Sequence, residues 1–170
     1  LFKGEILLNL DTEDDDELSI GCAGGIDTNT AYTCEMISPP DDYSFVQIDI
    51  KGLLGGHSGM DIDSGRGNAN KWMARILWNI SKKSILSLGS FDGGGLRNAI
   101  PREAKCTIAV PSTKLNSVKA EFEEQVKVIH TEYKSIEPNI LITITAADKM
   151  PKIISERDTT KILNTLCCAP

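Results

Sequence analysis

The sequence has no long apolar run, no cluster of basic residues and few aromatic side chains, which make up 5% of it. No stretch approaches the roughly 18 consecutive apolar residues that a membrane span needs, so we expect no membrane partner. The net charge is −6 and the pI is about 4.9, and the lysines and arginines form no stripe. Because nucleic acids are bound by gathered positive charge, this distribution argues against a nucleic-acid partner.

The beginning of the chain lacks both an initiator methionine and the apolar stretch of a signal peptide. We therefore expect a segment of a longer, cytoplasmic protein. The five cysteines include no C-x-x-C pair, which disfavours a zinc knuckle or a redox motif. Cys22, Cys34 and Cys106 lie in apolar or alternating stretches. We expect them to be free thiols that pack as small apolar side chains.

What the 170 residues do contain is an ordinary globular composition, with 41% hydrophobic and 25% charged residues. Apolar residues alternate, or recur at three- and four-residue spacing, in segments that predict strands and helices. The predicted strands lie near 46–50, 85–91, 104–110 and 140–144. The predicted helices lie near 68–80, where Asn68 can serve as the cap, and near 115–133. Their order, β-α-β-β-α-β, predicts a ferredoxin-like α+β fold with an antiparallel sheet and both helices on one face. Extra N-terminal strands are expected at 5–10, 17–22 and 30–37, and a short C-terminal helix over 159–166, capped by Asp158.

The first candidate site residue is Asp11, which directly follows the apolar run 5–10. A carboxylate at the carboxyl end of a buried strand lies where α/β sheets bind ligands and metals. An EF-hand loop starting here is excluded, because its sixth position is Asp16 rather than glycine and its twelfth is Cys22 rather than glutamate. From the residues alone, Asp11 is either a metal ligand or a cap.

The second candidate is His57, which lies in the glycine-rich stretch 51–59. An uncrowded imidazole in such a loop can donate a hydrogen bond to a developing oxyanion. The alternative is a turn in which the imidazole only bonds to the backbone. Ser58 is disfavoured as a nucleophile, because G-x-S-x-G requires glycine where Met60 stands. The other histidine, His130, falls in the second helix beside an apolar position, so we expect a structural role.

The third candidate region, 93–103, combines a run of three glycines with Arg97, Asn98 and Arg102. Guanidinium and amide donors match the geometry of a carboxylate, so these side chains are suited to an anionic group. The alternative is a β-turn with surface arginines.

Four strings carry a resemblance that no single motif would: LLNLDTEDDDELSIGCAGG, VQIDIKGLLGGHSGMDIDSGRGNANK, GGGLRNAIPREA and LNTLCCAP. In this order and spacing the chain closely resembles the aminoacyl-histidine dipeptidases, members of the co-catalytic zinc peptidase family that also contains the carnosinases. The resemblance implies a two-domain enzyme, in which a lid is inserted into a catalytic domain that holds two zinc ions. On this basis we expect residues 1–16 to end a catalytic-domain strand, residues 17–157 to form the lid, and residues 158–170 to lead back to the missing catalytic domain.

The same resemblance implies roles for individual residues. Asp11 corresponds to a zinc ligand, and His57 to the lid histidine that stabilises the tetrahedral intermediate. Asn98 corresponds to a substrate contact, and Arg97 and Arg102 flank it. The remaining zinc ligands and the general-base glutamate are missing, since no H-x-D segment occurs in the chain. We therefore expect no zinc stably bound to this segment and no activity from it alone.

The function that follows from the resemblance is that of a lid domain in a zinc dipeptidase that hydrolyses dipeptides with a C-terminal histidine. The expected partners are this dipeptide, the missing catalytic domain and a second copy in a homodimer. The alternative is a purely structural or dimerisation module of a related metallopeptidase with a different substrate. A third interpretation is a ferredoxin-like sensor of a small molecule.

Overall fold

The computed structural model of the chain describes residues 3–6, 16 and 26–169. Most of the predicted strands at 5–10 and 17–22, together with Cys22 and the candidate zinc ligand Asp11, lie outside the described residues. The chain divides into two compact units, residues 1–32 and residues 33–170. All described helices and strands belong to the second unit.

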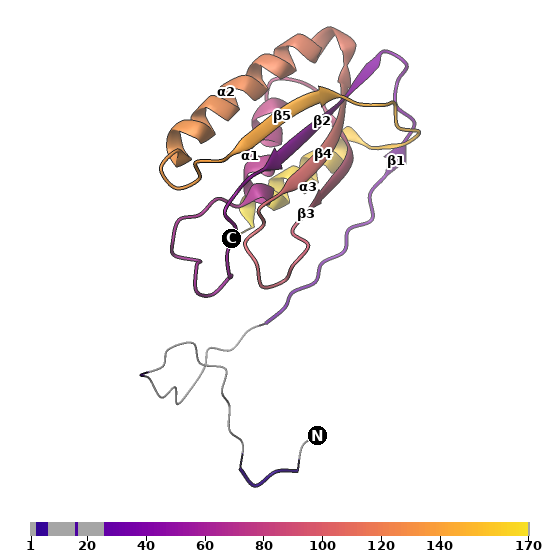
Figure 1. Ribbon diagram of the computed structural model, residues 1–170. Coiled ribbons are helices and arrows are strands. Elements are labelled where there is room, and N and C mark those ends of the chain that lie inside the picture. The colour runs from indigo at the N-terminus through magenta and orange to yellow at the C-terminus, as the bar shows by residue number, and fades with distance from the viewer. Residues whose placement is uncertain (1–2, 7–15, 17–25, 170) are drawn as a thin grey trace. The chain divides into compact units, whose positions relative to one another are not determined.

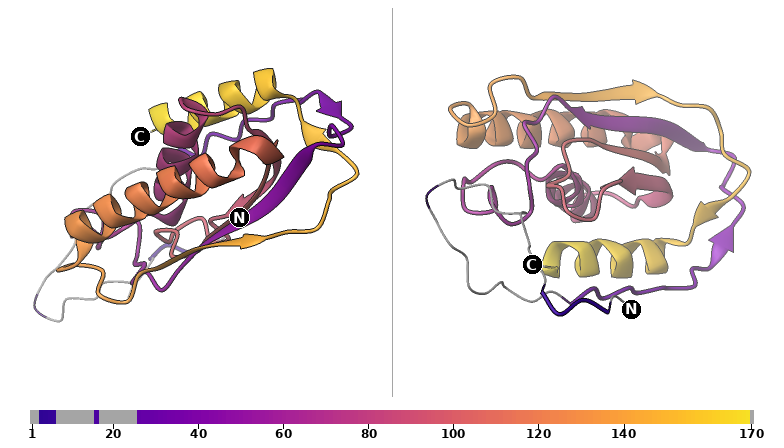
Figure 2. Two further views of the ribbon diagram at one scale, coloured as in Figure 1. Left: turned by 90° about the horizontal axis from the view of Figure 1, so that it is seen from above. Right: turned by 60° about the horizontal axis from the view of Figure 1, so that its bottom comes forward.

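A four-stranded antiparallel sheet is the frame of the second unit, with the spatial order β3-β4-β2-β5. Its strands are β2 (Tyr43–Lys51), β3 (Ser87–Gly93), β4 (Ala104–Pro111) and β5 (Leu141–Ala146). The helices are α1 (Ala69–Ser81), α2 (Leu115–Tyr133) and α3 (Glu156–Cys168), with a 3-10 turn η1 (Ser112–Lys114) before α2. The helices cover one face of the sheet, with α1 between α2 and α3 (Figures 1 and 2). The predicted ferredoxin-like arrangement is confirmed, with α3 as a third helix on the same face.

The core lies between this sheet face and the helices. Alternation in β2 turns Val46, Ile48 and Ile50 toward the helices, and all three are at most 1% exposed. Helix α1 contributes an apolar stripe at three- and four-residue spacing, which consists of Trp72, Met73, Ile76, Leu77 and Ile80. Because both patterns face the same layer, sheet and helix bury each other's apolar surface.

The helix ends agree with the sequence in one case and not in the other. The Asn68 side chain caps α1 by accepting a hydrogen bond from the Lys71 N–H at 3.2 Å, as predicted. Asp158 was expected to cap the last helix, and this prediction is wrong. Ser155 is the N-cap, and its hydroxyl accepts from the Asp158 N–H at 3.3 Å. The Asp158 carboxylate instead accepts from the Glu35 N–H at 2.8 Å, which ties α3 to the beginning of the unit.

A small second sheet joins the two ends of the unit. β1 (Met36–Ile37) pairs with β6 (Ile153–Ile154) in antiparallel register. The strand predicted over 30–37 is therefore shorter than expected, because a two-residue partner leaves nothing for the earlier residues to pair with. Phe45, Ala109 and Ile153 form a minor apolar cluster, which is separate from the main core.

Among the described residues, Cys106, Cys167 and Cys168 are free thiols, and for Cys106 this is as predicted. Cys106 lies in β4 among the core side chains and is fully buried. Burial raises the pKa of its thiol far above the ordinary value of 9.0, because no solvent stabilises the thiolate. Cys106 thus packs as a small apolar side chain.

Candidate functional site

Two loops meet at one end of the sheet and form a cleft. β2 and β4 are antiparallel neighbours, with Ile50 paired to Ala104, so the loop after β2 and the loop before β4 emerge side by side. His57 and Ala99 form a β-bridge between these loops. The Ser58 N–H donates to the Asn98 carbonyl at 3.0 Å, so His57, the residue before Ser58, is held beside the loop that carries Asn98.

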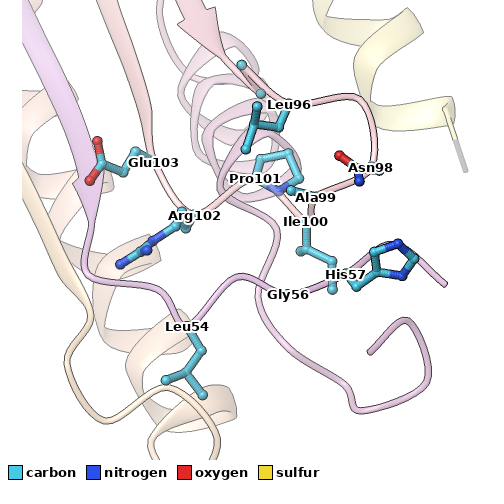
Figure 3. Close-up of a pocket in the computed structure, with 12 residues that line it drawn as sticks. Leu54, Gly56, His57, Leu96, Asn98, Ala99, Ile100, Pro101, Arg102 and Glu103 are labelled. Atoms are coloured by element: carbon cyan, nitrogen blue, oxygen red, sulfur yellow. The ribbon is translucent and has the colours of Figure 1, made fainter. Parts of the chain in front are cut away.

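The cleft is lined by His57, Asn98 and Arg102 among the predicted site residues, and by Leu54, Leu96 and Glu103 among residues that were not predicted. In Figure 3 the side chains of His57 and Asn98 lie toward one side of the cleft, whereas Arg102 extends toward the other. Arg97 is exposed and does not line the cleft. The structure therefore brings three of the four predicted lid residues to one place.

The hydrogen bonds of the His57 ring determine which of its nitrogens can donate. Nδ1 accepts from the Gly59 N–H at 3.2 Å and from the Met60 N–H at 3.3 Å. A nitrogen that accepts carries no proton, so in the neutral ring the proton lies on Nε2. The local turn thus presents an exposed imidazole with Nε2 as its donor.

The backbone of His57 is held by an ion pair that the sequence did not single out. The His57 N–H donates to Asp61 Oδ2 at 2.8 Å, and Asp61 Oδ1 pairs with Arg66 at 2.9 Å. Gly56 has a φ of +148°, and a Cβ atom there would lie 2.6 Å from Arg66 and 2.7 Å from Asp61. Glycine at this position therefore allows the loop to close over the ion pair.

The described residues do not supply a zinc site. No group of three or more His, Cys, Asp or Glu side chains in this part of the chain is arranged to hold a metal. A catalytic zinc in proteins takes three protein ligands and an open position, so the described donor set does not fit the ion. Among the described helices, none is long and apolar enough to cross a membrane.

Comparison with known proteins decides the family. The family model for the peptidase dimerisation domain matches residues 48–137, which include both His57 and Asn98. The chain belongs to the M20 peptidase dimerisation-domain family. The resemblance to the aminoacyl-histidine dipeptidases, stated from the sequence, is confirmed, and the relatives of this M20 domain named below are hydrolases.

This M20 domain is 39% identical over 159 residues to the cytosol non-specific dipeptidase of Escherichia coli K12. The aligned segment covers 92% of the chain and 33% of the relative. Its fold matches the crystal structure of aminoacylhistidine dipeptidase from Vibrio alginolyticus with a TM-score of 0.78 and 34% identity, covering 82% of the chain and 28% of that structure. A hydantoinase/carbamoylase-family amidase from Burkholderia multivorans has a TM-score of 0.51 at 13% identity, covering 66% and 28%, and shares the fold alone. The chain spans about a third of the length of the curated relative it matches.

Proposed function

We propose that this M20 domain is the lid of a zinc dipeptidase that hydrolyses dipeptides with a C-terminal histidine, and that it stabilises the tetrahedral intermediate when it closes over the substrate. The observation that carries the proposal is the His57 ring, which lines the cleft and whose Nδ1 accepts two backbone N–H groups, so that Nε2 is left as the donor. A donor aimed at a developing oxyanion lowers the barrier without reorganising during the reaction.

The substrate's carboxylate is the proposed ligand of the opposite loop. The Asn98 amide has donors that match a carboxylate or carbonyl oxygen, and it lines the same cleft as His57. Arg102 adds a positive charge from the other side of the cleft. Arg97 does not line the cleft of this chain, but it is adjacent to Asn98 in sequence and is proposed as a second cation for the substrate. These contacts would align the scissile bond with His57.

The chemistry of bond cleavage belongs to the catalytic domain of the proposed parent enzyme. Two zinc ions bound there would supply Lewis-acid activation, and Asp11 is the one ligand that this chain is proposed to contribute. Segments 38–44 and 148–157, which contain prolines, are the proposed hinges of lid closure. Cytoplasmic localisation, proposed from the sequence, is compatible with the relative from Escherichia coli, whose name describes a cytosolic dipeptidase.

The proposal is tested by assaying the full-length protein on Xaa-His dipeptides. We expect hydrolysis that is lost after treatment with a chelator and restored by zinc, because the metal activates the substrate. The isolated 170-residue chain should be inactive in the same assay. Hydrolysis by the isolated chain, or full-length activity on other dipeptides but none on Xaa-His substrates, would contradict the proposal.

Dimerisation is a second proposed function, which the family description itself favours. β3 and β5 each pair with a single neighbour among the described strands, so both are edge strands. An edge strand can pair with another chain through its unpaired backbone groups. Leu141 at the start of β5 is 55% exposed, which adds an apolar contact at this edge.

Light scattering of the full-length protein over a range of concentrations tests this second function. We expect the mass of a homodimer, and a shift toward the monomer in Leu141→Lys, because a charge at the edge opposes pairing. A monomer at every concentration would contradict dimerisation. A dimer unaffected by Leu141→Lys would exclude the β5 edge as the interface.

A further inference from the structure

We propose that Glu137 is a positioning residue for His57, which holds the His57 loop (residues 54–67) by its two ends from outside the cleft. This inference rests on the proposed function of His57. Glu137 is 1% exposed, and its carboxylate bridges two backbone groups that are far apart in the loop. Oε2 accepts from the Leu54 N–H at 2.8 Å and Oε1 accepts from the Gly67 N–H at 2.8 Å.

Two bonds to one carboxylate set the span between the loop's ends. Hydrogen bonds to an ionised acceptor are about twice as strong as those between neutral groups. Removing a carboxylate from water is costly, so a buried one is stable only where its oxygens are bonded. Glu137 meets this condition through its bonds to Leu54 and Gly67. The carboxylate can therefore stay buried only while the two ends of the His57 loop keep their distance from each other.

Glu137 itself is fixed by the connection between α2 and β5. Its N–H donates to the Tyr133 carbonyl at 2.8 Å, which continues the last turn of α2. The neighbouring Asn139 carbonyl lies against Gly52, where a Cβ atom would approach it to 2.2 Å. Glu137 and Asn139 therefore lie in the short connection between α2 and β5, and the side chains of both elements contribute to the core.

A short series of bonds connects the ends of the loop, which Glu137 holds, to His57. Arg66, next to Gly67, donates to the carbonyl of Gly55, next to Leu54, at 2.7 Å. This bond joins the two sides of the loop one residue inward from the residues that Glu137 binds. The same guanidinium pairs with Asp61, which accepts the His57 N–H. Apart from the bridge to Ala99, His57 lies in no strand or helix. Its position is therefore fixed by these side-chain bonds together with two backbone bonds, from the Ser58 N–H to the Asn98 carbonyl and from the Asp61 N–H to the His57 carbonyl.

Glu137→Gln is the sharpest variant, because it keeps the shape of the side chain and turns one acceptor into a donor that faces a backbone N–H. In the full-length enzyme we expect kcat on a Xaa-His dipeptide to fall by about 10- to 100-fold, since displacements of about 1 Å at a catalytic group have this effect. KM should change less, because Asn98 and Arg102 lie on the opposite loop. Hydrogen exchange should accelerate in residues 54–67.

A double mutant separates positioning from general stability. If Glu137 acts through His57, adding Glu137→Gln to His57→Ala should lower kcat no further. Glu121→Gln is the matched control, because Glu121 on α2 is also buried and bonded twice, to Lys83 and Gln125. Glu121→Gln should leave kcat and the exchange of residues 54–67 unchanged.

Unchanged kcat and exchange in Glu137→Gln would overturn the inference, as would an equal loss of kcat in the His57→Ala background. If Glu137→Gln does not fold, Arg66→Met tests the same path while keeping the aliphatic stem, and it must show the same non-additive loss. If His57→Ala keeps full turnover, the proposed function of His57 fails, whereas hydrogen exchange in Glu137→Gln still decides whether Glu137 holds the loop.

Discussion

His57→Ala in the full-length enzyme is expected to lower kcat by about 10²- to 10³-fold, the usual effect of removing one oxyanion donor. The reason is the ring geometry, in which the Gly59 and Met60 N–H groups engage Nδ1 and leave Nε2 to donate. Zinc content, measured by atomic absorption, should be unchanged, because in the proposed mechanism His57 contacts the substrate and does not bind the metal.

His130→Ala is the matched control, since His130 is exposed on α2 and does not line the cleft. It should retain the kcat of the parent enzyme. Loss of zinc in His57→Ala would show that the ring acts on the metal, and full turnover in this variant would remove His57 from the mechanism.

Gly52→Ala is expected to reduce the free energy of unfolding by roughly 2–5 kcal/mol. A side chain on a residue in the left-handed conformation costs about 1–2 kcal/mol, and overpacking adds about 1–3 kcal/mol. Gly52 has a φ of +80°, and the added Cβ atom would lie 2.2 Å from the Asn139 carbonyl oxygen. Neither partner is a flexible side chain, so the clash can be relieved only by moving the backbone. Urea denaturation of this chain, followed by far-UV circular dichroism, measures the effect.

Gly95→Ala provides the control for that experiment. A Cβ atom at Gly95 would meet nothing within 4 Å, and the glycine has no left-handed φ. The free energy of unfolding of Gly95→Ala should stay within about 0.5 kcal/mol of the value for the unmodified chain, as for most surface substitutions. Equal stabilities of the two variants would show that the contact between Gly52 and Asn139 is loose enough to accept a Cβ atom.

The fold could be predicted from the sequence in segments where apolar side chains recur at a single spacing, two residues in a strand or three to four in a helix. Val46, Ile48 and Ile50 alternate with polar residues, and the α1 stripe recurs at helical spacing, so both elements and their buried faces follow from local pattern. The end of the chain was harder. Asp158 has the chemistry of an N-cap, but its bond to Glu35 lies 123 residues away in sequence and is set only by tertiary packing.

The candidate site shows the same division. His57 and Asn98 were found because each stands in a glycine-rich motif, and the pairing of β2 with β4 brings their loops together. Glu137 was missed, because a glutamate beside a proline in a connection is normally solvated, and nothing local indicates that it is 1% exposed. Asp11 lies outside the described residues and stays a prediction.

The two tryptophans of α1 lie in different surroundings. Trp72 is buried, and its ring centroid is 4.6 Å from that of Tyr133 on α2. The half-buried Trp78 donates from Nε1 to Asn164 on α3 at 3.1 Å, with the Lys82 ammonium 3.1 Å from its ring centroid. Indole emission depends on the polarity and charge around the ring. The emission of Trp72 should therefore report the α1–α2 contact, and that of Trp78 the docking of α3 on α1.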